Sequence, residues 1–358
     1  MALFEVTDHD RQIYEQELRD FLPRKIIDIH THVWLESLIK KKSGEFRAVT
    51  WPTLVASDNS IEDLQETYRL MFPDKEVSAL FFGSSKPGYM DAINDYTAQC
   101  SKKSGFPALY YSTPDESPER LEQKIRAGGF LGLKSFLNLA PSYIPENEIR
   151  IFDFFPKNQL KKMDEMGAIV MLHIPRSGRL KDPVNLHQIV ELKREFPRVG
   201  LIVAHIGRAY CQSDIGDAFT FLAQCPDLMF DFSANCCDDA MEALLRAAGP
   251  KHVMFGSDLP ILRMRTRRIT ENGTYINLVP PGLYGDPKQD PHLREVSPEE
   301  AEKITFFMYE ELLAFKRVAR KLSLSAADIE DVFYNNAAAM IARARESIYG
   351  DGVGHNGK

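Results

Sequence analysis

The sequence predicts an α/β protein, a (β/α)8 or TIM barrel, and three observations lead to this fold class. Short apolar runs recur along the 358 residues, and helical patterns separate nearly all of them. Eight strands that alternate with helices form a parallel sheet that closes on itself. A doubly wound open sheet is the alternative, but it would ordinarily carry a glycine-rich phosphate turn after its first strand, where this chain has histidines.

The predicted strands are short apolar runs bounded by Gly, Pro or polar residues. The first, KIIDIHTHV at 25–33, has an apolar core that is too short for a helix. His30 and His32 stand at its end, and both point to the same side because strand side chains alternate. The other strands cover 77–82, 108–111, 130–136, 168–173, 199–205, 228–232 and 252–258.

Helix start and stop signals mark the segments between these strands. Ser60 with Asp63 forms an N-terminal cap, and Pro118 stands in a first helical position, where no amide donor is needed. Residues 34–59 lack periodicity and are expected to form a loop over the end of the first strand. We expect helices at 60–71, 88–103, 117–128, 158–166, 182–192, 214–224 and 238–248.

The chain has additional helices at both ends. Residues 1–22 indicate a short amphipathic helix outside the main fold. A capping box at 297–300 leads into a helix predicted over 304–322, and a further helix runs through 329–340. These N- and C-terminal helices are extra to a barrel.

A long insertion, residues 259–296, follows the eighth strand. It is rich in Pro, Gly and Arg but also contains apolar residues, so we expect a lid or an arm that could join a homodimer rather than disorder. No break in composition divides the chain, and we expect a single domain over 1–358 with a barrel core at about 24–345.

The composition is that of an ordinary globular protein and excludes several classes of function. The net charge of −7 argues against a general nucleic-acid binder. The N-terminus lacks a signal-like apolar run, and no run approaches a membrane span. Five cysteines without CxxC spacing do not suggest a disulfide framework, so a cytoplasmic location is the simplest expectation.

Polar residues stand at the ends of several predicted strands, where barrels carry their catalytic groups. These residues are His30, His32, Lys134, His173, His205 and Asp258. A single buried histidine would be better explained as a hydrogen-bonded core residue. Four of the nine histidines, with an acid at a further strand end, indicate instead a metal site. Three imidazoles and one carboxylate suit zinc, and also manganese or iron.

Several of these segments are also motifs of a known family. The chain resembles the amidohydrolase superfamily, in its amidohydrolase-2 branch with the aminocarboxymuconate-semialdehyde decarboxylase-like enzymes. The resemblance spans roughly 24–345 in the same order. The matching pieces are IDIHTH at 27–32, LHIP at 172–175, AHIG at 204–207, FGSDLP at 255–260 and the closing VFYNNAAAMI.

The resemblance implies one divalent ion, zinc before manganese or iron, and assigns roles to the histidines and to Lys134. The implied metal ligands are His30, His32, His173 and Asp258. His205 would stay unligated or weakly ligated and would polarise the substrate or handle a proton. In some relatives a lysine at the position of Lys134 is carbamylated and bridges two metals. We favour an unmodified lysine here, which either contacts an anionic substrate or packs structurally.

The predicted reaction is hydrolysis of an ester, lactone or amide by metal-activated water. Asp258 would take the proton and pass it to the leaving group, while His205 stabilises the oxyanion. Non-oxidative decarboxylation of a hydroxylated or unsaturated acid, with Asp258 protonating carbon, is the alternative. A metal-binding barrel without catalysis is a remote third hypothesis, because metal retention alone does not require the pair Asp258 and His205.

Arginines that follow the catalytic strand ends predict a small anionic substrate. Arg176 follows His173 and Arg208 follows His205, and both would grip a carboxylate or phosphate. Arg263 opens a basic run that continues to residue 268, which could equally be a solvated or interfacial charge cluster. Trp34, directly after the first strand, is the remaining predicted substrate contact.

Overall fold

The computed structural model describes residues 3–39, 52–84, 89–286 and 290–350. At its centre lie eight strands that pair in parallel within this part of the chain. They are β1 (Lys25–His32), β2 (Glu76–Phe82), β3 (Tyr110–Tyr111), β4 (Gly132–Lys134), β5 (Ile169–Leu172), β6 (Gly200–Val203), β7 (Met229–Asp231) and β8 (Val253–Met254). Each matches a strand predicted from the apolar runs.

The strands follow one another in chain order, and backbone hydrogen bonds join the two places where the regular ladders stop. Between β2 and β3, the amide of Leu109 donates to the carbonyl of Phe81 at 2.9 Å. Between the end of β8 and β1, Ile29 donates to Phe255 at 3.0 Å and His32 to Leu259 at 2.9 Å. These bonds close the sheet, and the predicted barrel is confirmed.

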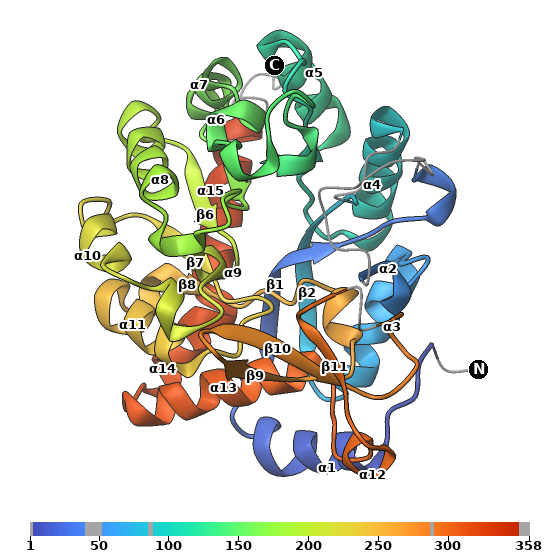
Figure 1. Cartoon of the computed structure of the whole chain (residues 1–358). Coiled ribbons are helices and arrows are strands. Elements are labelled where there is room, and N and C mark those ends of the chain that lie inside the picture. The colour runs from blue at the N-terminus through green and yellow to red at the C-terminus, as the bar shows by residue number, and fades with distance from the viewer. Residues whose placement is uncertain (1–2, 40–51, 85–88, 287–289, 351–358) are drawn as a thin grey trace.

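Helices surround the sheet in the order of the chain, as Figure 1 shows. They are α3 (Ile61–Met71), α4 (Met90–Ser104), α5 (Pro118–Gly128), α7 (Lys157–Met166), α8 (Pro183–Glu195), α10 (Ala218–Leu222) and α11 (Asp238–Ala248). Local sequence sets their starts: the hydroxyl of Ser60 accepts from the amide of Asp63, and Asp182 accepts from the first amides of α8. The predicted loop at 34–59 is described only in part, since 40–51 lie outside the described residues.

Some strands are shorter than the sequence predicts at their carboxyl ends. The strand expected at 199–205 stops at Val203, and the one expected at 252–258 stops at Met254. His205 and Asp258 adopt left-handed backbone angles, with φ of 58° and 50°, which end the extended conformation. The apolar runs therefore predict burial correctly but include residues that turn out of the sheet.

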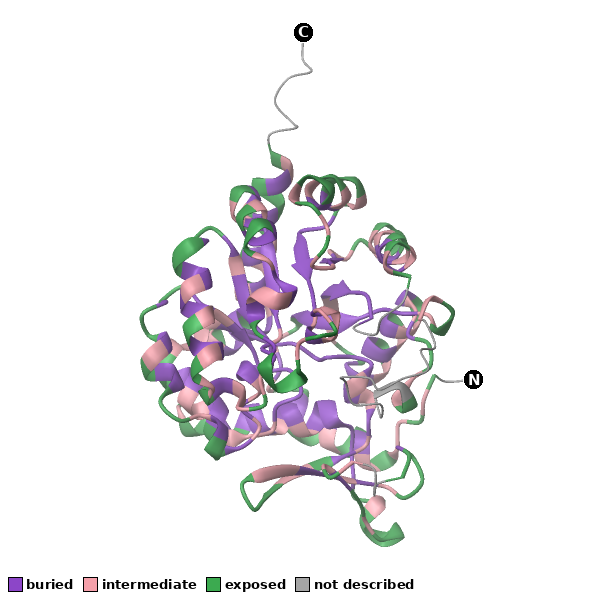
Figure 2. Ribbon diagram, turned by 45° about the horizontal axis from the view of Figure 1, so that its top comes forward, coloured by how far each residue is buried: buried purple, intermediate pink, exposed green. Residues whose placement is uncertain are grey.

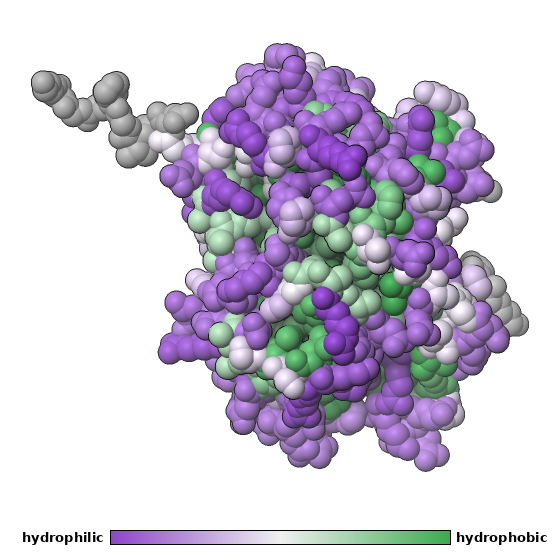
Figure 3. Space-filling model, turned by 90° about the vertical axis from the view of Figure 1, so that its left-hand side faces the viewer, coloured by the Kyte–Doolittle hydropathy of each residue, from purple (hydrophilic) through white to green (hydrophobic). Residues whose placement is uncertain are grey.

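Two apolar cores hold the barrel together. One lies inside the sheet, where Ile29, Met171 and Ile202 meet Met340 of the C-terminal helix α15 (Asn336–Tyr349). The other fills the layer between the sheet and the surrounding helices. Figure 2 accordingly shows buried residues along the strands and exposed residues on the outer helix faces. The face at the left of Figure 1 is mainly hydrophilic, with hydrophobic residues in its central recess (Figure 3).

The insertion at 259–296 contains a small sheet, which we call the arm. Its strands are β9 (Arg267–Glu271), β10 (Thr274–Val279) and β11 (Leu293–Glu295). β9 and β10 form an antiparallel hairpin, and β11 adds in parallel to β10. The hairpin reaches the loop after β6, where the hydroxyl of Ser213 donates to the carbonyl of Gly273 at 3.0 Å.

The terminal helices are more broken than predicted. At the N-terminus, α1 (Asp8–Ile13) continues as a π-helical turn to Leu18. The capping box at Ser297 opens only the short α12 (Pro298–Ala301), and the long α13 (Phe307–Lys321) starts separately. Within the described ranges, no helix combines the length and apolar character needed to cross a lipid bilayer.

Glu311 on α13 is fully buried, and no described donor meets either carboxyl oxygen in full hydrogen-bond geometry, although the backbone of Ala234 and Asn235 lies close to it. Burial raises its pKa well above the ordinary value, with only partial opposition from the backbone of Ala234 and Asn235. The folded state therefore holds a proton that the unfolded chain releases near its ordinary pKa. Stability contributed by this group is present at low pH and is lost as the pH rises.

We therefore expect Glu311→Gln to stabilise the protein at neutral and alkaline pH. The slope of unfolding free energy against pH should become less negative by up to about 1.4 kcal/mol per pH unit, the value for one proton. Urea unfolding at pH 4 to 8 measures this slope. Glu330→Gln is the matched control, because Glu330 is exposed. Equal slopes for wild type and Glu311→Gln would contradict the expectation.

Candidate metal centre

The structure brings the histidines at three strand ends into one cluster. Ring centroids lie 5.8 Å apart for His30 and His32, 4.7 Å for His30 and His205, and 5.3 Å for His173 and His205. Asp258, after β8, joins them through Oδ1, which lies 3.1 Å from Nε2 of His32 and 3.7 Å from Nε2 of His30. All five side chains are buried or nearly so. They come from β1, β5, β6 and β8, as predicted.

An irregularity in β1 turns its two histidines into the barrel. Ile27 and Ile29 belong to the core inside the sheet, so regular alternation would place 31 inside and 30 and 32 outside. The pairing with β2 shifts register between Asp28 and Thr31, and beyond the shift His32 pairs with inward-facing Phe82. A one-residue shift reverses the faces, which is how bulges re-aim side chains beside active sites.

Asp28 supports this irregularity from the outer side of the strand. Its carboxylate accepts the amides of His30 at 3.1 Å and Ser257 at 2.9 Å, and the hydroxyl of Tyr68 at 2.7 Å. Burial raises the pKa of Asp28 to about 6 despite these bonds. One carboxylate thus ties the turn of β1 to the segment that carries Asp258. Sequence reasoning included this residue in a motif but gave it no role.

Three of the imidazole rings are oriented by a hydrogen bond from Nδ1 to an acceptor outside the cluster. His30 donates to Oδ2 of Asp231 at 2.9 Å, His32 to the carbonyl of Gly83 at 2.9 Å, and His205 to the carbonyl of Ser233 at 3.0 Å. With the proton on Nδ1, each ring directs a bare Nε2 lone pair away from its anchor. Metal-binding histidines are typically held by such outer partners.

The neutral imidazoles and the ionised carboxylate of the cluster favour the binding of a cation. Burial lowers the pKa of His32 and, with the charge of His30, lowers that of His205 to about 4, so both rings are neutral at pH 7. Burial would raise the pKa of Asp258, but its close contact with His32 and the nearby rings of His205 and His30 hold the pKa below its ordinary value. Bare nitrogens therefore face an ionised carboxylate, and a metal ion would satisfy these converging lone pairs.

His173 provides a second indication of the same kind. Its Nδ1 is buried and has no hydrogen-bond partner among the described residues. Burial, followed by the charge of Arg208, lowers the pKa of His173 well below its ordinary value, so the ring is neutral. An orphaned buried nitrogen is costly in a folded protein. A cation within reach of this nitrogen would remove that cost.

The most compact group differs from the predicted ligand set. His30, His205 and Asp258 offer ligand atoms that all lie within 4.8 Å of one another. The resemblance gave His205 a free or weakly ligated role and named His32 and His173 as ligands. That assignment stays a prediction, since the five residues lie together and the geometry admits His205 as well.

Asp231, at the end of β7, is a site residue that sequence reasoning missed. It is fully buried, and its Oδ1 accepts the amide of His205 at 2.9 Å while Oδ2 accepts His30. Burial would raise its pKa, but the charge of His30 and its hydrogen bond hold the pKa well below the ordinary value. The available signal was an acid directly after an apolar run, the same pattern that identified Asp258.

We expect Asp231→Asn to weaken zinc binding by about 10- to 100-fold, the usual effect of losing an outer partner of a ligand. Both carboxylate oxygens of Asp231 now accept hydrogen bonds, and the amide would replace one of them by an NH2 donor. Calorimetric titration of metal-free protein measures the effect. Asp227→Asn is the control, because the side chain of Asp227 is 63% exposed and pairs with Lys193 at 2.7 Å. Equal zinc affinity in the two variants would refute the role of Asp231.

Lys134 ends β4 as a buried cation without a partner. It is 2% exposed, and no described residue forms a hydrogen bond or ion pair with its ammonium group. Its Nζ lies 5.3 Å from the ring centroid of Phe82, which also contacts His30 and His32. Burial lowers the pKa of Lys134 to about 8, against the charges of Asp231 and Asp258. A cation so placed suits a substrate anion.

Aromatic side chains frame the cluster beside Lys134. Phe82 lies 4.6 Å from the ring of His32, Phe136 lies 4.6 Å from His173, and Trp34 lies 5.9 Å from His32. The indole of Trp34 is fixed because its Nε1 donates to the carbonyl of Ser57 at 2.9 Å. The walls of the site are therefore apolar and flat.

The predicted substrate-binding arginines have different surroundings. Arg176 is engaged by Asp182 at 3.2 Å. Nη1 of Arg208 donates hydrogen bonds to the carbonyls of Ile174 and Pro175, and its positive charge helps to lower the pKa of His173.

Arg263 lies away from the cluster. Its guanidinium lies 5.7 Å from the ring centroid of Phe4 and lines a cavity of about 850 Å³ that contains none of the cluster residues. The structure therefore brings Arg208 to the cluster but does not bring Arg263 there.

Unusual backbone angles concentrate at this end of the barrel. Non-glycine residues rarely adopt positive φ, and such strain gathers at functional sites. Most of the positive-φ residues in the described chain follow β5, β6, β7 or β8. They are Arg179, His205, Ile206, Arg208, Ala234 and Asp258, while Asn272 and Ser323 lie elsewhere.

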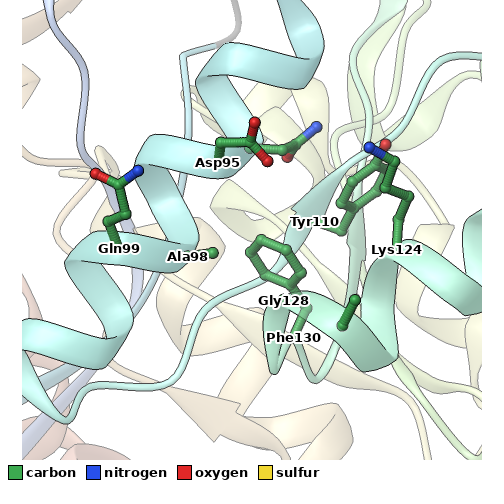
Figure 4. A pocket seen from close by; sticks show the side chains of 9 residues that line it. Asp95, Ala98, Gln99, Tyr110, Lys124, Gly128 and Phe130 are labelled. Carbon is green, nitrogen blue, oxygen red and sulfur yellow. The ribbon is translucent and has the colours of Figure 1, made fainter.

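A separate cavity of about 320 Å³ lies between α4 and α5 (Figure 4). Asp95 and Gln99 line it from α4, Lys124 from α5, and Tyr110 and Phe130 from the segments beside them. It contains no predicted site residue.

Comparisons with known proteins agree with this architecture. A family model described as amidohydrolase matches residues 27–343. No curated protein matches the chain. Many solved structures resemble it, and the identities of the three described next show the fold alone.

An amidohydrolase from Burkholderia multivorans with bound zinc has a TM-score of 0.55 and 13% identity, over 88% of this chain and 99% of that one. 4-Oxalomesaconate hydratase from Rhodopseudomonas palustris has a TM-score of 0.54 and 15% identity, over 91% and 98%. 2,6-Dihydroxybenzoate decarboxylase from Rhizobium has a TM-score of 0.52 and 13% identity, over 90% and 99%.

Proposed function

Because the chain belongs to the amidohydrolase family of metal-dependent enzymes, we propose that it hydrolyses an ester, lactone or amide bond in a small anionic substrate. One observation carries the proposal: imidazole nitrogens of the histidines and the carboxylate of Asp258 converge at the carboxyl end of the barrel. Such an arrangement is a place for a cation and for water.

The proposed ligands are His30, His32, His173 and Asp258, with one divalent ion, zinc in the first place. The anchored rings of His30 and His32 and the orphaned Nδ1 of His173 support this set. A bound ion would lower the pKa of water and polarise the substrate carbonyl. The zinc in the Burkholderia structure supports the choice of metal only by analogy of fold.

Asp258 and His205 are the proposed proton carriers. Asp258 is held ionised, so it accepts a proton from water and returns it to the leaving group. His205 donates its Nδ1 proton to Ser233, which leaves Nε2 as an acceptor. The predicted role of His205 in stabilising an oxyanion therefore requires that it first take a proton on Nε2.

The proposed substrate is a carboxylate that binds beside Lys134 and Arg208. No carboxylate of the described residues forms an ion pair with Lys134, and pairing it with a substrate carboxylate would offset the cost of its burial. The guanidinium of Arg208, adjacent to His173, presents further donors. Phe82, Phe136 and Trp34 favour a flat, unsaturated body.

Decarboxylation of such an unsaturated or hydroxylated acid is the second candidate, favoured by the same aromatic walls next to a cation. Asp258 would then first take a proton from water or from a substrate hydroxyl and pass it to the carbon from which carbon dioxide departs. The similarity to a dihydroxybenzoate decarboxylase adds support at the level of the fold only.

The test is a substrate screen of metal-loaded protein. Protein stripped with a chelator is reloaded with zinc or manganese and offered lactones, amides and hydroxylated aromatic acids, while acid release and carbon dioxide are recorded. We expect turnover that disappears with the metal. Acid release without gas supports the hydrolase, and gas evolution supports the decarboxylase instead. Turnover that survives complete metal removal would overturn both.

A further inference from the structure

The turn after β7, residues 231–235, lies between the metal cluster and the arm. On its inner side it holds two histidines of the cluster: Asp231 accepts from the ring of His30 and the amide of His205, and Ser233 accepts the Nδ1 proton of His205. The positions of both rings therefore depend on the conformation of this turn.

The turn contains a left-handed residue and is contacted from outside. Ala234 has a φ of 52°, in the left-handed region that disfavours a side chain. Asn235 secures one end, since its Nδ2 donates to the carbonyl of Ala209 at 2.9 Å. The carbonyl of Ala234 itself accepts a hydrogen bond from Arg268 on the arm, at 2.6 Å.

Arg268 is fixed on all sides. Its Nε donates to Oδ1 of Asn277 at 2.9 Å on the neighbouring strand β10. Its guanidinium lies 4.4 Å from the ring centroid of Phe307, 4.5 Å from Tyr275 and 4.8 Å from Tyr210. No described carboxylate forms an ion pair with Arg268. The planar guanidinium group, held between aromatic rings and hydrogen-bonded to two oxygens, has a single orientation. The ammonium group of a lysine could not make the same contacts.

We propose that Arg268 is a positioning residue of the metal site, which fixes the Ala234 turn and through it the ring of His205. This inference rests on the proposed function for its catalytic meaning. The arm then does more than cover the barrel, because its seating on Ala234 determines where Nε2 of His205 points. The adjacent Arg267 lies on the same strand with an exposed side chain. Its guanidinium donates to the carbonyl of Lys303 and pairs with the carboxylate of Glu310 instead.

The first test uses metal-free, full-length protein labelled with ¹⁵N-histidine. The Nδ1 proton of His205 is buried and bonded to Ser233, so it should give a slowly exchanging signal, assigned by its loss in His205→Gln. We expect Arg268→Gln and Arg268→Lys to lose or shift this signal, while Arg267→Gln keeps it. Asn277→Ala, which frees the guanidinium without removing it, should shift the signal if the Arg268 variants fail to fold.

The second test is the zinc affinity of the same variants. We expect a loss of about tenfold for Arg268→Gln, because the same turn also holds the proposed ligand His30 through Asp231, and no loss for Arg267→Gln. If wild type binds no zinc, the proposed function fails, and the His205 signal alone decides the positioning role. The proposal would be overturned if Arg268→Gln only loosened the arm. That outcome would appear as faster hydrogen exchange at 267–279 with an unchanged His205 signal and an unchanged zinc affinity.

Discussion

Asp258→Asn is expected to lower kcat by about 10³-fold, within the range that proton transfer contributes to catalysis. The amide cannot take a proton from water, and it presents NH2 to the bare Nε2 of His32, which now lies 3.1 Å from Oδ1. The measurement is kcat at saturating zinc, with bound metal determined for each sample. A variant that holds a full complement of zinc but turns over slowly separates proton transfer from metal binding.

Asp115→Asn is the matched control for this experiment, because Asp115 is exposed and lies outside the cluster. We expect it to retain wild-type kcat. Wild-type turnover by zinc-loaded Asp258→Asn would remove Asp258 from the mechanism, whichever of the two reactions the protein catalyses.

Lys134→Met is expected to make the folded protein more stable and substrate binding weaker. The ammonium is fully buried, and its pKa of about 8 lies below the ordinary value of 10.5, so the cost of burying the charge is present at pH 8 and below. That difference corresponds to about 3 kcal/mol at about 1.4 kcal/mol per pH unit. We expect unfolding at pH 7 to require up to that much more free energy in the variant, and Tm to rise by a few degrees.

The same substitution should impair substrate binding. Loss of a charge-assisted contact with a carboxylate should raise KM by about 10- to 100-fold with a smaller effect on kcat. The stability gain should shrink as the pH rises above about 8 and vanish above about pH 11, where the lysine is neutral in both states. Lys161→Met serves as the control, since Lys161 is exposed on α7. Unchanged stability together with unchanged KM would mean that Lys134 is neither strained nor in contact with substrate.

The parts of the fold that local sequence controls were predictable. Ser60, Asp182 and Pro118 mark helix starts through contacts within a few residues, and the structure has helices at all three. Apolar runs located the strands because burial between helices leaves little choice of residue. Left-handed turns were not predictable at His205 and Asp258, since neither residue is a glycine and the glycines of their motifs, Gly207 and Gly256, stand two positions away.

The candidate site was predictable as a set of residues but not as an arrangement. The rule that barrels carry polar groups at strand ends found His30, His173 and Asp258. It could not show that Asp231 supports His30, because these residues are 201 positions apart. It also could not show that Asp182 engages Arg176, since a charged side chain in a sequence does not reveal its partner.

By itself the sequence determined the strands, the helices and which residues stand at the mouth of the barrel, because hydrophobic periodicity and end signals act over a few residues. Only the tertiary structure decided which way those residues face. The register shift in β1, the protons on Nδ1 of three histidines and the solitary charge of Lys134 each depend on segments that meet through folding. The energies of these features come from burial and from partners that are distant in the sequence. The neighbouring residues therefore do not predict them.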